Sequence, residues 1–152
     1  MAGLGRRMRV AFLDYIRASV TTSALSTIYA GFSTAAPGDD ASTIAEPTIG
    51  TGGYARAQLG TGGVAWTAVA TPTAGSPARL LNSGTVTWGP SSAAWSTTTS
   101  PLTHIAYWTA SSGVTEATFV GFGAVSTPPI VNAAGITITA AASALEINID
   151  DT

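Results

Sequence analysis

Short stretches in which apolar and polar residues alternate recur along this chain, and they constrain its fold more than any other feature. Thr85–Trp88, Gly135–Thr139 and Leu145–Ile149 each place apolar side chains at every second position. Successive side chains of a β-strand point to opposite faces, so a period of two is typical of a half-buried strand. Turns rich in Gly, Pro, Asn and Ser separate these stretches. The pattern predicts an all-β fold.

Eight stretches are expected to form strands. They are Thr27–Ser33, Tyr54–Leu59, Ala65–Ala70, Gly84–Gly89, His104–Thr109, Thr115–Val125, Gly135–Ala141 and Leu145–Ile149. About eight short strands joined by Gly- and Pro-rich turns are typical of a β-sandwich or barrel. We therefore expect a β-sandwich, jelly-roll-like in its arrangement.

The first residues predict a different element. Leu4–Ser19 is expected to form a short helix, because Met8, Phe12, Tyr15 and Ile16 follow the spacing of one apolar helical stripe. A helix this short is marginal in isolation. Its stripe must therefore dock on its own sandwich or on a neighbouring subunit. We divide the chain into an N-terminal helical arm, residues 1–22, and a β-sandwich domain, residues 23–152.

Charge is scarce and unevenly placed. Only 9% of the residues are charged, against about 25% in typical domains, and the formal charge of −2 argues against a nucleic-acid binder. A basic amphipathic arm suits docking on a large acidic protein lattice, and the residues expected to bind a partner are Arg6, Arg7, Arg9, Phe12, Tyr15, Ile16 and Arg17.

Several site and targeting classes are excluded or disfavoured by single residues. The chain has no cysteine, which excludes disulfides, zinc thiolates and a cysteine nucleophile. Asp14 interrupts the apolar run Val10–Ile16, which argues against a signal peptide. No stretch approaches the roughly 18 apolar residues that a membrane span needs, so no membrane association is expected.

The loop Thr34–Gly53 contains the main cluster of carboxylates in the body. Asp39, Asp40 and Glu46 could bind calcium through oxygen ligands. The favoured interpretation is local: Asp side chains cap the turn, and Arg56 pairs with Glu46 or Asp40 at the surface. The residues expected to shape this loop are Pro37, Asp39, Asp40, Glu46 and Arg56. No metal and no cofactor is expected.

An enzyme is the least favoured class. His104 is the sole histidine, and no G-x-S-x-G motif is present. A triad assembled in space stays open, as does a pair of carboxylates for glycoside cleavage, but few acids are available for either. The aromatic residues favour core or interface positions over a carbohydrate platform; they are Trp66, Trp88, Trp95, Tyr107 and Trp108.

The stretch Ile28–Arg56 also carries a family resemblance. It reads as a strand, AP-x-DD, EP, GGYAR and a new strand, with a weaker echo in Thr103–Trp108 and Ala110–Gly113. This pattern resembles small virion structural proteins of tailed bacteriophages, which carry names such as tail-fibre-like, minor tail or head-decoration protein. The resemblance spans Leu25–Ile149 and is carried by Pro37, Asp39, Asp40, Glu46, Pro47, Gly52, Gly53, Tyr54 and Arg56.

The resemblance implies a non-enzymatic phage virion protein, made in the cytoplasm of the bacterial host. We expect a capsid accessory protein, of the decoration or cement kind, that binds the major capsid protein lattice on the head surface as a homo-oligomer, most plausibly a trimer. The reason is that the chain shows no coiled-coil, collagen-like or β-helical shaft. The alternative is a tail or tail-fibre component that contacts host surface glycans, and a cell-wall hydrolase is a third, disfavoured reading.

Overall fold

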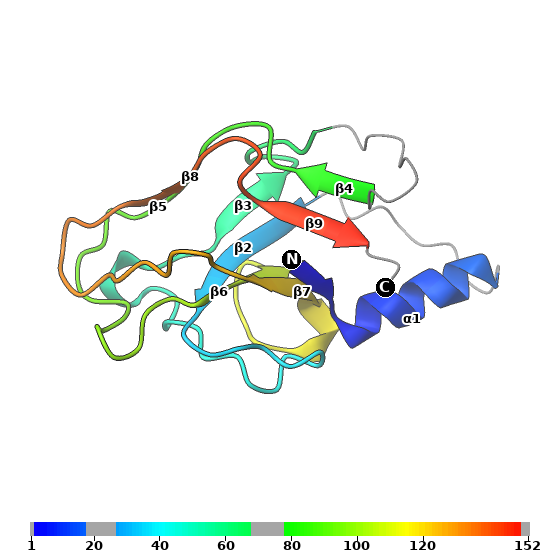
Figure 1. Cartoon of the computed structure of the whole chain (residues 1–152), viewed down its shortest axis with the longest axis horizontal. Helices are drawn as coiled ribbons and strands as arrows, with labels where there is room; N and C mark the ends of the chain where they lie inside the picture. The colour runs from blue at the N-terminus through cyan, green and yellow to red at the C-terminus, as the bar shows by residue number, and fades with distance from the viewer. Residues whose placement is uncertain (1, 18–26, 68–77, 150–152) are drawn as a thin grey trace.

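The computed structural model describes residues 2–17, 27–67 and 78–149. Its elements in these ranges are β1 (Ala2–Leu4), α1 (Arg6–Ile16), β2 (Thr27–Ser33), η1 (Thr51–Gly53), β3 (Ala57–Gly60), β4 (Ala78–Leu81), β5 (Val86–Trp88), β6 (His104–Trp108), η2 (Glu116–Thr118), β7 (Phe119–Ala124), β8 (Ile138–Ala140) and β9 (Glu146–Ile149). The predicted all-β, sandwich-like architecture with one short helix is confirmed (Figure 1).

The first layer is a five-stranded antiparallel sheet in the order β1-β7-β6-β2-β3. Strand alternation gives this sheet two apolar faces. In β2, Ile28, Ala30 and Phe32 enter the main core, while Tyr29 packs in a second cluster on the opposite face. The sheet therefore needs a cover on both sides.

The second layer is a narrow ribbon made of two antiparallel pairs, β4–β9 and β5–β8. Asn82, which is fully buried, joins them. Its side chain donates to the carbonyls of Gly84 and Ala141 at 2.6 and 2.8 Å and accepts the N–H of Leu145 at 2.8 Å. The ribbon arches over the five-stranded sheet (Figure 1), and the main core lies between the two layers.

The loop between β2 and β3 covers the other face of the sheet. Its residues Ala41 and Ile44 pack against Trp108 and Phe119, and Ala41 is only 5% exposed. The β2–β3 loop is therefore the outer layer of this side. On the ribbon side, the Nε1 of Trp88 donates to the Ala30 carbonyl of β2 at 2.9 Å, which links the ribbon to the sheet.

Several predicted bounds are wrong, for local reasons. The helix begins at Arg6 instead of Leu4, because Ala2–Leu4 pairs with β7 and the N–H of Gly5 continues that pairing to the Val120 carbonyl. The sequence missed both β1 and β4. The end of the predicted strand Ala65–Ala70 lies outside the described residues. The division at residue 22 stays a prediction, although β1 is part of the main sheet.

None of the helices in the described ranges is long and apolar enough to cross a bilayer.

Candidate functional site

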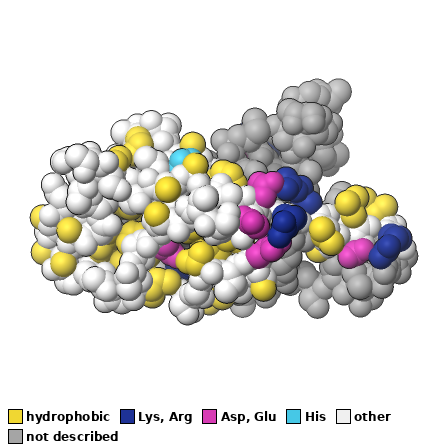
Figure 2. All heavy atoms as spheres, turned by 90° about the horizontal axis from the view of Figure 1, so that it is seen from below, with side chains coloured by type: hydrophobic (Ala, Val, Ile, Leu, Met, Phe, Trp, Pro, Cys, Tyr) yellow, Lys and Arg dark blue, Asp and Glu magenta, His cyan; other side chains and the backbone are white. Residues whose placement is uncertain are grey.

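The start of α1 is fixed to the body by ion pairs. Arg6 donates from Nε and a terminal nitrogen to both carboxylate oxygens of Glu116, at 2.7 Å each. Arg9 pairs with Asp39, and the backbone N–H of Arg6 donates to the Asp39 carbonyl at 2.8 Å. The hydrogen bonds and charge of Arg6 lower the pKa of Glu116. These side chains form the mixed patch of positive and negative groups beside the helix in Figure 2.

This patch changes the expected role of the basic arm. Arg6 and Arg9 each face a carboxylate of the body, and Arg17 lies 3.0 Å from Asp14 on the helix itself. These three cations therefore do not form an unpaired basic surface for an acidic lattice. The side chains of Arg7, Phe12 and Tyr15 lie outside the described part of the chain. Partner binding by these residues stays a prediction.

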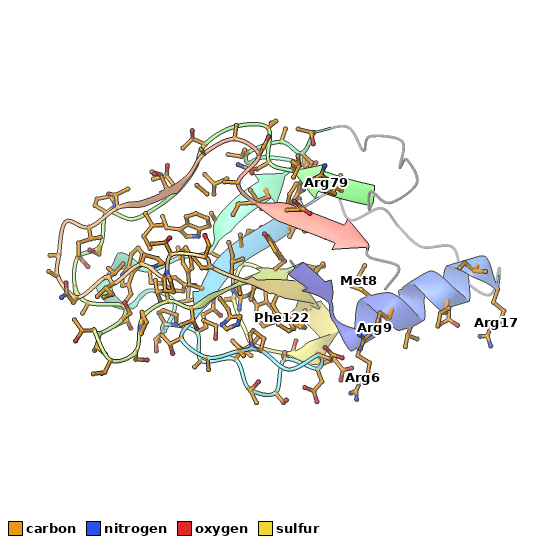
Figure 3. The ribbon with its side chains drawn as sticks, viewed as in Figure 1. Arg6, Met8, Arg9, Arg17, Arg79 and Phe122 are labelled. Atoms are coloured by element: carbon orange, nitrogen blue, oxygen red, sulfur yellow. The ribbon has the colours of Figure 1, made fainter. Side chains whose placement is uncertain are left out.

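The predicted apolar stripe of the helix is divided between a residue packed on the core and an exposed one. Met8 packs against the main core and leaves the helix on the side opposite to Arg6 (Figure 3). Ile16, in contrast, is 64% exposed, because only the first turns of α1 lie against the sheet and the rest projects beyond it (Figure 1). Val10, Leu13 and Ile16 are all exposed, and we call them the α1 apolar face.

A buried ionic network lies under the β2–β3 loop. Arg56 donates from Nε and a terminal nitrogen to the two carboxylate oxygens of Glu46, at 2.8 and 2.6 Å. Its nitrogens also donate to the carbonyls of Ala110 and Gly113, at 2.8 Å each. The guanidinium carbon lies 4.1 Å from the ring centroid of Trp108, a cation–π arrangement. One side chain thus ties the loop to the turn that follows β6.

The expected Glu46–Arg56 pair is present, but it is not the surface pair that the sequence led us to expect. The two side chains are 4% and 0% exposed. Tyr54 completes the network: its hydroxyl accepts the N–H of Phe32 at 2.7 Å and donates to Glu46 at 3.0 Å. Burial raises the pKa of Tyr54 well above its ordinary value. Sequence reasoning missed this role of Tyr54. The only sequence signal for a buried network was that an Arg and a Glu occur close together in a segment with few charges.

The other loop residues have separate roles. Pro37 is buried. Asp40 accepts the N–H of Ser42 at 3.0 Å, the local capping that was expected, and this bonding with Ser42 lowers the pKa of Asp40. Asp39 turns instead to Arg9 of the helix. Within the described ranges, no three acidic or histidine side chains are grouped so that they could hold a metal ion.

The aromatic residues form no exposed platform. Trp88, Trp95, Tyr107 and Trp108 are each 7% exposed or less, and Trp66 is partly buried against the core. The core interpretation of these rings is therefore the one that the structure shows.

The sole histidine lies at the start of β6. His104 contacts the hydroxyl of Thr103 through Nδ1 at 2.9 Å. Its ring lies 6.2 Å from that of Phe122, between centroids. Partial burial lowers the pKa of His104.

A cavity of about 720 Å³ opens between the two layers, where the ribbon bends. Its walls come from β6 and from the end of β7 with the segment after it. The opposite wall comes from β8, the start of β9 and the segment between these two strands. Its lining includes the buried side chains of Phe32, Trp88 and Tyr107. Sequence reasoning did not identify this cavity, because its walls come from segments far apart in the chain.

A protein-family model matches most of the chain. The family model described as "Podophage GP4 fiber I protein gp80" matches residues 6–148, which is nearly the whole chain. No curated protein matches the chain.

Proposed function

The chain belongs to the family of podophage GP4 fiber I protein gp80, and from this membership we propose that it is a component of the phage tail fibre. Membership of this family makes the chain a structural protein of a phage virion. The fibre reading was the alternative drawn from the sequence, and the family description supports it better than the capsid-decoration role. The single observation that carries the proposal is the match over residues 6–148.

The absence of a sequence-detectable shaft is compatible with this role. A fibre assembly needs compact parts as well as elongated ones, and a sandwich domain with a projecting helix can be such a part. The α1 apolar face supports an attachment role, since exposed apolar groups that lie together usually mark interfaces. We propose that α1 joins the domain to another virion protein, and that the assembly is a homo-oligomer, with a trimer favoured.

A non-enzymatic role fits the described side chains. His104 contacts a threonine hydroxyl and an aromatic ring. The carboxylates of Glu46, Asp39 and Glu116 each bind an arginine. These groups are used to hold loops and the helix in place, which supports a structural protein over a hydrolase.

Labelling the protein on whole virions tests the fibre proposal. Gold-conjugated antibodies against the purified domain, viewed by electron microscopy, should decorate the tail region. Label distributed over the head would instead support the decoration reading and contradict the fibre proposal. Light scattering of the purified protein and of its virion complex gives the oligomeric state, and a monomer in both would contradict the trimer.

The α1 attachment is tested with particles assembled on a host that supplies variant protein. Replacing Val10, Leu13 and Ile16 together by Ser should leave a folded domain that is missing from virions. Ser in place of the exposed Val114 and Ile130, which lie off the helix, is the matched control and should be incorporated normally. Normal incorporation of the triple variant would contradict the attachment role.

A further inference from the structure

The cavity beneath the bend of the ribbon has the size of a small-molecule site. Its volume of about 720 Å³ falls within the roughly 300–1,000 Å³ of known ligand pockets. It exists because the second layer is only a narrow ribbon. In this ribbon, β8, β9 and the segment between them leave part of β6 and β7 without cover. The hollow is therefore a built feature of the two unequal layers.

The base of the cavity is apolar. Phe32, Trp88, Ile105 and Leu145 line it, with each side chain 8% exposed or less. Because these groups are packed in the core, they present a fixed surface and not flexible side chains. Such a base suits the C–H groups of a ligand and gives it a defined floor.

Hydroxyl groups and one carboxylate lie among the walls. Ser126, Thr127 and Thr139 are exposed and line the cavity, together with the carboxyl-bearing Glu146. Arg79 approaches Glu146, with 3.8 Å between nitrogen and oxygen. None of the described lining residues is itself a cation, so an anionic ligand would find a carboxylate and no positive partner among them.

Tyr107 adds a buried polar group. It is 1% exposed, and its hydroxyl donates to the Glu146 carbonyl over 3.5 Å, the outer limit of a hydrogen bond. Burial raises the pKa of Tyr107, so the group stays a neutral hydroxyl that can donate and accept. The wall therefore holds a neutral group at this point, which suits an uncharged ligand.

We propose that this cavity binds a neutral saccharide. The ligand would pack its C–H groups against the apolar lining and exchange hydrogen bonds with Glu146 and with the exposed hydroxyls of Thr127 and Thr139. Neutral sugars carry many hydroxyls that can donate to a carboxylate, whereas the carboxylate of a sialic or uronic acid would find no cation among the described lining residues. The proposal rests on the fibre function proposed above, since a fibre is the virion part that meets host surface glycans.

Binding is measured by NMR titration of the purified full chain with single sugars. Methyl glycosides of glucose, galactose and mannose are the neutral probes, with glucuronic acid and N-acetylneuraminic acid as the acidic ones. A single ring is expected to bind weakly, with a dissociation constant on the order of 1 mM for at least one neutral probe. Acidic probes should bind at least about tenfold more weakly.

Variants locate the binding. Ala144→Trp should fill the cavity and weaken binding by at least about tenfold, because Ala144 is exposed and lines it. Ala134→Trp is the matched control, since Ala134 is exposed and not among the lining residues. Thr139→Val keeps the shape of an exposed lining side chain and removes its hydroxyl, so it should also weaken binding. Circular dichroism and the Tm of each variant show that it is folded.

The outcomes separate this inference from the fibre proposal. Neutral-sugar binding that is lost in Ala144→Trp and kept in Ala134→Trp supports the inference. The inference is overturned if no neutral probe binds, if acidic probes bind as well as neutral ones, or if both tryptophan variants behave alike. If the inference is overturned but the gold label lies on the tail, the fibre function is still supported. Label on the head contradicts the fibre function, whether or not sugars bind.

Discussion

Replacing Glu46 by Gln should destabilise the protein strongly, and the chain contains its own control. Arg56 donates two hydrogen bonds to Glu46, at 2.8 and 2.6 Å. Arg6 donates two hydrogen bonds to Glu116, at 2.7 Å each. The two forks thus have nearly the same geometry. They differ in burial: the side chains are 0% and 4% exposed in the first pair and 57% and 39% exposed in the second.

The expected loss for Glu46→Gln is about 3–5 kcal/mol, the typical cost of breaking a buried ion pair from one side. The amide has nearly the shape of the carboxylate, so no cavity adds to this value. What remains is a buried guanidinium held by two carbonyls and the face of Trp108. A domain has only about 5–15 kcal/mol of stability in total, so this loss is a large part of it. Glu116→Gln should cost little, because water solvates both partners.

Urea unfolding followed by tryptophan fluorescence measures both variants. With a slope near about 2 kcal/mol per molar urea, the midpoint of Glu46→Gln should fall by about 1.5–2.5 M, while that of Glu116→Gln should hardly move. Similar midpoints for the two variants would show that burial of the Glu46–Arg56 pair contributes little. A loss below about 1 kcal/mol for Glu46→Gln, the range of a surface pair, would refute the reasoning as well.

Four further expectations follow from particular contacts. Gly31→Ala should cost about 1–3 kcal/mol in urea unfolding, because the added Cβ would lie 2.6 Å from a Glu46 oxygen; an unchanged midpoint would contradict this. Asn82→Ala should cost about 1–3 kcal/mol, since the buried N–H of Leu145 and the part-buried carbonyls of Gly84 and Ala141 lose their partner, and a ribbon that keeps its slow amide exchange would argue otherwise. Stability should fall as the pH rises above about 10, because burial raises the pKa of Tyr54 and Tyr107 in the folded state while the unfolded chain ionises normally; tyrosinate absorbance of all four tyrosines before unfolding would count against it. Calcium and chelator should leave the Tm unchanged, whereas a calcium-dependent rise that Asp40→Ala abolishes would reveal a metal site.

The main sheet was predictable where a short, mostly apolar run lies beside turn residues, which is the pattern of a strand buried on both faces. β2 has the predicted bounds Thr27–Ser33, and β6 differs only in ending at Trp108. β4 has no such signal: Ala78–Leu81 pairs with β9 through contacts made far along the chain. β1 was missed, and its last residue, Leu4, was placed in the predicted helix, because three residues are too few to show any period.

The candidate site was harder to predict, because its contacts join distant residues. A loop rich in turn residues predicted that Asp40 would cap locally. Nothing local shows that Arg6 meets Glu116 across 110 positions, or that the cavity joins β6 to the bend of the ribbon. The burial of Arg56 was equally hidden, since it depends on how the β2–β3 loop folds back over the sheet.

The helix is an excursion between two strands of one sheet, which has a mechanical consequence. The chain enters α1 from β1 and later continues into β2, and the sheet order makes these two strands antiparallel. A tensile load on α1 along the strand direction would therefore pull both strands toward the same end of the sheet. Their hydrogen bonds to β7, β6 and β3 lie across that direction, so they would bear the load together in shear instead of opening one after another.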